Sequence, residues 1–222
     1  MTITDLEAAG FVELLYDGNV GGFDHIDTGE GDDGVYWGLK RLGDFDLVVL
    51  RGSTTALDWE RDFESVVVST PELGAVHRGF FIGMRQLLGE LRGMLEGRRF
   101  IILGHSLGAA RGALLAGLAT VAGIPPAGVL LFGEPRPGFE RLAQIVAPLT
   151  WRSYRNADIN GHDAVTDVPA HVPLVFPFVH PKPLIDVCCS PPDSDDWGPF
   201  RYHHFALYHY GLSRVDPMPA VE

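Results

Sequence analysis

Phe100-Ile101-Ile102-Leu103-Gly104-His105-Ser106-Leu107-Gly108 joins an apolar run to a G-x-S-x-G pentapeptide. The apolar run predicts a buried strand, and the Gly- and Ala-rich residues 107–122 predict a helix that packs closely on a sheet. A serine on the turn between such a strand and helix forms a nucleophile elbow, which holds the hydroxyl of Ser106 clear of the sheet. Gly104 and Gly108 have no Cβ, so the chain can turn this sharply without a steric conflict. Ser106 is therefore the candidate nucleophile.

Length, composition and charge limit the class of protein. The chain has 222 residues, of which 46% are hydrophobic, and can bury roughly 70% of its unfolded surface in one core. We therefore expect residues 1–222 to form a single domain. The net charge is -12, and no basic cluster occurs beyond Arg98-Arg99. This charge argues against nucleic acids and anionic membranes as partners, because both require a positive patch.

The N-terminus and the cysteines predict a cytoplasmic protein. The residues after Met1 lack the basic and apolar regions of a secretion signal, and no apolar stretch is long enough to span a bilayer. The two cysteines, Cys188 and Cys189, are adjacent, and a disulfide between neighbours demands strained backbone geometry. We expect both to be reduced, as suits the cytosol.

Strands and helices alternate along the chain, which predicts an α/β fold with a mostly parallel sheet covered on both faces. Residues 27–34 are expected to form a loop before the first strand, and residues 35–39 and 47–50 a hairpin. Apolar residues recur at helical spacing through residues 77–97, which predicts one amphipathic helix. The remaining expected elements are strands at residues 100–103, 129–132 and 150–154, and helices at residues 107–122, 139–146 and 202–212. The chemistry should lie at the carboxyl ends of the strands.

An elbow of this kind is followed along the chain by an acid and then by a histidine. The carboxylate candidates after Ser106 are Glu134, Glu140, Asp158, Asp163, Asp167 and Asp186. Asp163 stands out because it follows a predicted strand, and Gly161 supplies a turn that can aim its carboxylate toward the elbow. The histidine candidates are His162, His171, His180, His203, His204 and His209. His203 and His204 are neighbours at the expected start of the last helix, so they cannot both point at Ser106.

Four further motifs lie in order along the chain: Leu50-Arg51-Gly52-Ser53 with Trp59 and Asp62 after it, Val76-His77-Arg78-Gly79-Phe80, Phe132-Gly133-Glu134-Pro135-Arg136-Pro137-Gly138, and Asp163-Ala164-Val165-Thr166-Asp167-Val168-Pro169. Together with the elbow, these motifs resemble those of the class 3 lipases, the fungal-type triacylglycerol lipase group of the α/β-hydrolase fold. The resemblance extends over about residues 47–212. It implies an α/β-hydrolase-like three-layer sandwich.

The resemblance also implies roles at matching positions. Asp163 stands where the family has its catalytic aspartate. His203 lies five residues before Tyr208, as the family's catalytic histidine lies before a tyrosine, whereas the frequent D-H form of that motif favours His204. We take His203 as the base and keep His204 as the alternative. The oxyanion hole would be formed by Ser53 and by the backbone amide of Leu107, which opens a helix where the dipole favours negative charge.

The expected activity is hydrolysis of carboxylic esters, either acylglycerols or short- to medium-chain esters, through an acyl-enzyme on Ser106. Residues 54–63 take the place of the family's lid, with Trp59 as a candidate substrate contact and a transient lipid interface as a further partner. Two alternatives stay open: acyl transfer by the same triad, and a non-catalytic interaction module. The nine histidines show no H-E-x-x-H pattern and no Cys/His ligand spacing, so we expect neither a metal nor another cofactor.

Overall fold

A computed structural model of the chain describes residues 3–29, 34–53, 66–190 and 200–215. The expected lid at residues 54–63, with Trp59, lies outside the described residues. Among those described, one sheet has the strand order β1-β2-β3-β6-β7-β8-β10, with β9 paired to β8. The strands are β1 (His25–Asp27), β2 (Trp37–Leu42), β3 (Phe45–Leu50), β6 (Arg99–His105), β7 (Gly128–Phe132), β8 (Trp151–Asp158), β9 (Gly161–His162) and β10 (Leu184–Val187).

The sheet is parallel at its centre and antiparallel at one side. The strands β3, β6, β7, β8 and β10 are parallel neighbours, whereas β1, β2 and β3 form an antiparallel meander. A separate hairpin joins β4 (Val67–Thr70) to β5 (Gly74–His77). The expected mostly parallel sheet and the β2–β3 hairpin are therefore confirmed.

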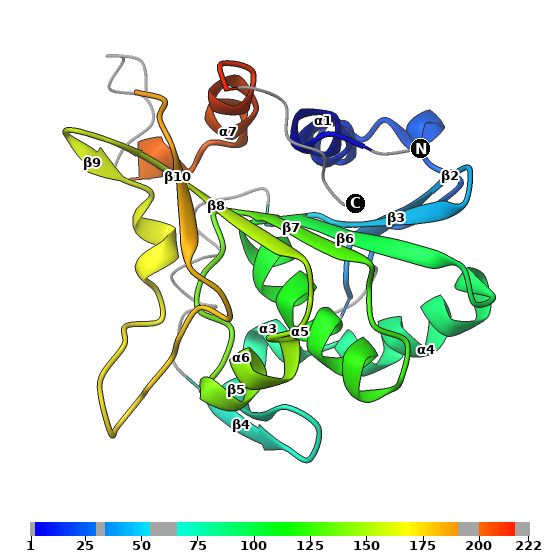
Figure 1. Cartoon of the computed structure of the whole chain (residues 1–222), viewed down its shortest axis with the longest axis horizontal. Coiled ribbons are helices and arrows are strands. Elements are labelled where there is room, and N and C mark those ends of the chain that lie inside the picture. Colours follow the sequence, from blue (N-terminus) through cyan, green and yellow to red (C-terminus); the bar gives the residue numbers. More distant parts are fainter. Residues whose placement is uncertain (1–2, 30–33, 54–65, 191–199, 216–222) are drawn as a thin grey trace.

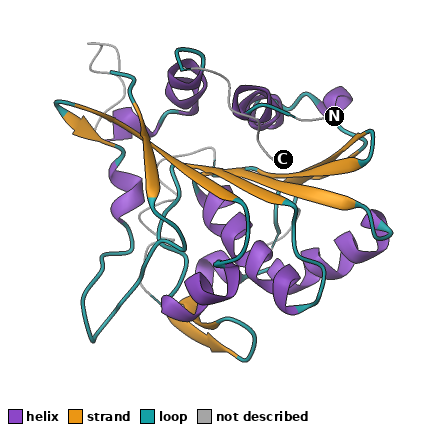
Figure 2. Ribbon diagram, viewed as in Figure 1, coloured by secondary structure: helices purple, strands orange, loops and turns teal. Residues whose placement is uncertain are grey.

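Helices cover both faces of the sheet, as Figures 1 and 2 show. One face carries α1 (Asp5–Tyr16) and α7 (Phe205–Leu212), which contact each other. The opposite face carries α3 (Arg78–Phe81), α4 (Met84–Leu95), α5 (Leu107–Val121) and α6 (Glu140–Val146). This arrangement confirms the three-layer sandwich.

Two hydrophobic clusters, one on each face, hold these layers together. Side chains alternate between the faces of a strand, and β6 divides accordingly. Ile101 and Leu103 pack in the cluster with α1 and α7, whereas Ile102 packs in the cluster with α4 and α5. All three are buried. The central strands are therefore apolar on both sides, which is why they read as continuous apolar runs in the sequence.

Three element predictions were wrong in detail. The helix expected at residues 77–97 is interrupted, because Gly83 has φ +79 and separates α3 from α4, a conformation that glycine adopts without strain. The last helix begins at Phe205, so His203 and His204 lie in the turn before it. The acidic loop does not precede the first strand, since β1 ends at Asp27.

The helix α1 escaped prediction because its apolar residues show little periodicity. Thr4 caps it through a reciprocal pair of hydrogen bonds with Glu7, and its buried face includes Val12 and Leu15. The buried Asp5 accepts a hydrogen bond of 2.7 Å from the half-buried Arg152, which ties α1 to β8. Within the ranges described, no helix has the length and apolar character needed to cross a membrane.

Candidate active site

The nucleophile elbow forms at the junction of β6 and α5. Ser106 has φ +63 and ψ −130, a backbone conformation that is strained for a residue with a side chain. A Cβ at Gly104 would lie 2.4 Å from the carbonyl oxygen of Gly108, and one at Gly108 would lie 2.2 Å from that of Leu50. Both glycines are therefore required for β6, α5 and β3 to approach one another. Ser106 is buried, and its Oγ has no hydrogen-bond partner among the described residues.

Asp163 and His203 meet in a buried hydrogen bond. Asp163 precedes the short 3-10 helix at Ala164–Asp167, where its Oδ1 accepts the amide of Val165 at 2.9 Å. Its Oδ2 lies 2.7 Å from Nδ1 of His203 and also accepts the hydroxyl of Tyr208. Burial raises the pKa of Asp163, but the charge and hydrogen bond of His203, with the bonds from Tyr208 and Val165, outweigh it and leave the pKa below its ordinary value. Asp163 is therefore a carboxylate at neutral pH.

The end of β7 lies next to both the elbow and this pair. The amide of Ser106 donates to the carbonyl of Phe132 at 3.0 Å, and Gly133 follows Phe132 directly. A Cβ at Gly133 would lie 2.8 Å from Oδ2 of Asp163 and 2.9 Å from Cε1 of His203. Gly133 has φ +57. A glycine is needed at this position both for its backbone conformation and for the close packing of the aspartate and the imidazole.

A second histidine connects the elbow to α1. Tyr16 accepts the amide of Gly52 at 3.1 Å, and its hydroxyl lies 2.8 Å from Nδ1 of His105. Nε2 of His105 lies 3.1 Å from the carbonyl oxygen of His203. Burial, together with the nearby His203, holds the pKa of His105 well below its ordinary value. A neutral imidazole with hydrogen on Nε2 satisfies every contact: Gly52 donates to Tyr16, Tyr16 to His105, and His105 to His203.

The two expected oxyanion donors lie next to the elbow. A Cβ at Gly52 would lie 2.8 Å from Cβ of Ser106, so the backbone leading into Ser53 packs against the serine. Ser53 is half-buried. Leu107 is the first residue of α5, where backbone amides have no acceptor within the helix and point outward from its positive end. The structure thus places the backbone at Gly52 and the first residue of α5 next to Ser106.

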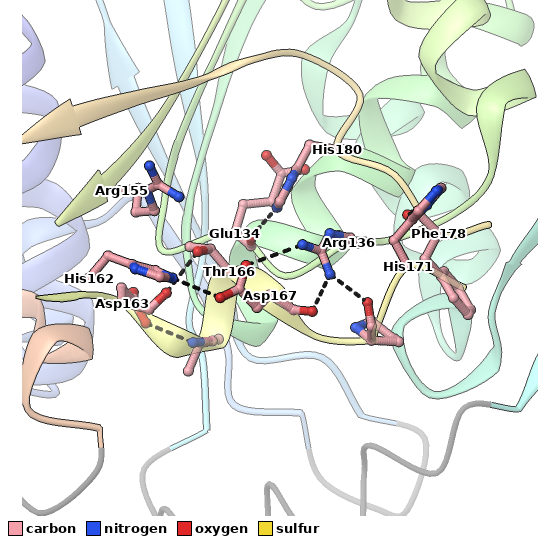
Figure 3. Close-up of polar contacts among 12 residues, drawn as sticks. Glu134, Arg136, Arg155, His162, Asp163, Thr166, Asp167, His171, Phe178 and His180 are labelled. Carbon is pink, nitrogen blue, oxygen red and sulfur yellow. Dashed lines mark hydrogen bonds and ion pairs between the residues drawn. The ribbon is translucent and has the colours of Figure 1, made fainter. Parts of the chain in front are cut away.

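Figure 3 shows how the loop that carries Asp163 is braced. Arg136 donates to the carbonyl oxygens of Asp167 and Pro169, the latter at 3.0 Å, and to Oδ1 of Asp167 at 3.2 Å. His162 lies 2.7 Å from Oδ2 of the same Asp167. Arg136 thus has a structural role, since its hydrogen bonds to Asp167 and Pro169 fix the loop that carries Asp163.

The other candidates from the sequence have partners elsewhere. His171 and His180 bond the carbonyls of Phe178 and Glu134, and His209 pairs with Glu13. The remaining carboxylates have other partners or none near His203. Asp158 accepts a hydrogen bond from the hydroxyl of Tyr202, and Asp186 accepts one from Arg155. Glu140 is exposed in the first turn of α6. His204 is exposed at the N-cap position of α7, and of the two neighbouring histidines it is His203 that hydrogen-bonds Asp163.

Glu134, which directly follows Gly133, is a fully buried carboxyl group. The sequence identified it only as one of several carboxylate candidates and did not indicate that it is buried. Its Oε2 accepts Ser153 Oγ at 2.6 Å, and its Oε1 is buried without a hydrogen-bond partner among the described residues. Burial raises the pKa of Glu134 to about 8, so the side chain is a neutral acid at pH 7. No group of three or more potential metal ligands occurs within the part of the chain that the structure describes.

Comparisons with known proteins find one matching family model and several matching solved structures. The family model described as Lipase (class 3) matches residues 47–172. The triacylglyceride lipase of Rhizomucor miehei superposes with a TM-score of 0.68 at 18% identity, over 91% of this chain and 92% of that one. A triacylglycerol lipase from Penicillium expansum gives a TM-score of 0.64 at 19% identity, over 82% and 77% of the two chains.

A third solved structure has a similar likeness. It is a triacylglycerol lipase whose catalytic centre is formed by a serine protease triad, with a TM-score of 0.63 at 20% identity, over 88% of this chain and 86% of that chain. A search of curated protein sequences finds no significant match. At these identities the solved structures establish a shared fold, and the family model supplies the relationship in sequence.

Proposed function

The chain belongs to the class 3 lipase family and is a carboxylic ester hydrolase, and on that basis we propose that Ser106, His203 and Asp163 are its catalytic triad. The substrates we propose are acylglycerols or short- to medium-chain esters. The single observation that carries the proposal is the packing at Gly133. A Cβ there would lie within 3.0 Å of both Asp163 and His203, and the preceding residue, Phe132, accepts a hydrogen bond from the amide of Ser106.

In the acylation step, the Oγ of Ser106 attacks the ester carbonyl while its proton passes to Nε2 of His203. The hydrogen bond to Asp163 keeps a hydrogen on Nδ1 of His203, so the lone pair of the imidazole is on Nε2. The charge of Asp163 also stabilises the imidazolium that forms. His203 then returns the proton to the leaving alcohol as the tetrahedral intermediate collapses to an acyl-enzyme. General acid–base catalysis of this kind contributes about 10²- to 10⁴-fold.

Deacylation repeats these steps with water in place of Ser106. Water attacks the acyl carbonyl, gives its proton to His203, and releases the carboxylic acid as Ser106 regains its proton. In both steps the carbonyl oxygen becomes an oxyanion, which the amides of Ser53 and Leu107 stabilise. Loss of one such donor costs about 100- to 1000-fold in kcat.

One of the matched structures supports this assignment of roles. It is a triacylglycerol lipase whose catalytic centre is described as a serine protease triad, that is, a serine, a histidine and an aspartate. By analogy, the residues that occupy this arrangement in the present chain carry the reaction.

The experiment that tests the proposal is turnover of a soluble p-nitrophenyl butyrate by the Ser106→Ala variant. We expect kcat to fall by at least about 10⁴-fold without a change in thermal stability, because Oγ has no hydrogen bond to lose. The control is Ser213→Ala, which removes a hydroxyl that bonds the carbonyl of Tyr210 at 2.7 Å at the end of α7. Turnover by Ser106→Ala at the rate of this control would disprove the proposal.

A further inference from the structure

The loop that carries Asp163 continues into a segment of unusual composition. Residues 168–181 contain no Asp, Glu, Lys or Arg in a chain of net charge -12. Within it, Val172, Leu174, Val175 and Phe176 are exposed, and Leu174 is fully exposed at 101%. In Figure 1 this part of the chain projects from the body of the molecule at the lower left, in yellow and orange. We refer to residues 172–176 as the apolar tip.

The apolar tip is held in a defined conformation. Val172 and Phe176 exchange both backbone hydrogen bonds, at 2.9 and 2.8 Å, and the amide of Val175 donates to the carbonyl of Val172 at 3.1 Å. Leu174 has φ +67, a conformation that favours glycine or asparagine over leucine. A tight turn thus presents a bulky apolar side chain at its most protruding position, where neither burial nor backbone preference accounts for leucine.

Both ends of the apolar tip are anchored to the protein. On one side, Arg136 donates to the carbonyl of Pro169 at 3.0 Å and to the side chain of Asp167 (Figure 3). On the other side, Phe178 is fully buried against Phe139, with ring centroids 5.0 Å apart. The contact of 2.8 Å between Nδ1 of His171 and the carbonyl of Phe178 joins the two sides. The tip is therefore a preformed projection, and inserting it into another phase requires little further ordering.

We propose that the apolar tip docks the protein onto the uncharged surface of an aggregated lipid ester. This rests on the proposed function, since the substrate must be presented at that surface. The distribution of charge indicates a neutral lipid as the binding partner of the tip. A chain of net charge -12 is repelled by anionic membranes, whereas an uncharged apolar projection is attracted to a neutral lipid phase. Along the chain the tip follows the loop that carries Asp163, so the surface to which it docks is linked to the catalytic loop through an ordered segment.

The test compares two double variants that make the same chemical change at different places. Leu174→Asn with Val175→Thr makes the tip polar, and asparagine suits the positive φ of residue 174. The control is Ile159→Asn with Val20→Thr. It is matched in exposure, since Ile159 is 100% exposed against 101% for Leu174, and Val20 is 64% exposed against 62% for Val175. Val20 lies in the Val20–Gly22 turn at the opposite end of the molecule.

Binding is measured by flotation with neutral phosphatidylcholine vesicles and, separately, with anionic phosphatidylglycerol vesicles. We expect the wild type and the control to bind neutral vesicles more tightly than anionic ones. The tip variant should bind neutral vesicles at least about tenfold more weakly, because burying one side chain the size of leucine changes affinity by about that factor or more. Equal binding by all three proteins, or no binding by the wild type, would overturn the proposal.

Two activity readouts separate this inference from the proposed function. On emulsified tributyrin the tip variant should lose about tenfold in rate, and on dissolved p-nitrophenyl butyrate it should match the wild type. Absence of turnover of the dissolved ester by the wild type would count against the catalytic assignment, while flotation still measures docking. Gel filtration completes the test, since a dimer in the wild type that dissociates in the tip variant would identify the occupant as a second copy and overturn the proposal.

Discussion

Gly133→Ala is the substitution for which the structure gives the sharpest prediction. The added Cβ would lie 2.8 Å from Oδ2 of Asp163, and 2.9 and 3.0 Å from Cε1 and Nδ1 of His203. Ordinary contacts of a Cβ begin at about 3.4 Å, so both side chains must retreat by at least about 0.5 Å. A displacement of 1 Å in catalytic groups costs about 100-fold. We therefore expect kcat to fall by about 10- to 100-fold.

The control must reproduce the backbone strain without the collision. Gly43 has φ +55, against +57 for Gly133, and a Cβ there would meet nothing within 4 Å. A left-handed alanine costs about 1–2 kcal/mol at either position. Thermal melts of Gly133→Ala and Gly43→Ala should therefore both show this loss, whereas only Gly133→Ala should lose kcat on p-nitrophenyl butyrate. If Gly133→Ala kept kcat within twofold of Gly43→Ala, the packing argument for the triad would be refuted.

Three further predictions concern groups around the triad. Tyr16→Phe should lower stability by about 1–3 kcal/mol and kcat severalfold, because Gly52 and His105 each lose a buried partner; unchanged melting and kinetics would contradict this. His204→Ala should keep kcat within about twofold of the wild type, whereas His203→Ala should lower kcat by about 10²- to 10⁴-fold. The reverse pattern would show that His204 is the base. In the wild type, the free energy of unfolding should fall by on the order of 4 kcal/mol as the pH rises from 4.5 to 8, because the folded state keeps the proton of Glu134 to about pH 8 whereas the unfolded chain loses it near pH 4.5. The Glu134→Gln variant should not show this fall. Parallel pH profiles of unfolding for the wild type and Glu134→Gln would contradict the last.

The elements nearest the elbow could be predicted because their sequence patterns are local. The strand ending at His105 and the helix beginning at Leu107 are specified by an apolar run, two glycines and a small-residue stretch that follow one another directly. The sheet order could be anticipated only as mostly parallel, since nothing local in the sequence states which strands become neighbours. The break at Gly83 was missed because helical periodicity continues across it and the positive φ has no effect on the apolar pattern.

The candidate site was predictable to the extent that its residues lie in motifs. Asp163 and Ser106 stand in recognisable contexts, whereas the pair His203 and His204 could be separated only in three dimensions, where a hydrogen bond to Asp163 distinguishes them. Tyr16 was missed because it contacts His105 across 89 residues, from a helix that carries none of the catalytic motifs. The raised pKa of Glu134 results from complete burial, which the local sequence does not determine.

The most direct test of the triad is the site and rate of labelling by a fluorophosphonate, which reacts with an activated serine. Peptide mass spectrometry of the folded protein should find one adduct, on Ser106, and the rate of its formation should fall by at least about 100-fold in His203→Ala. An adduct on another residue, or equal rates of labelling with and without the imidazole of His203, would contradict the account.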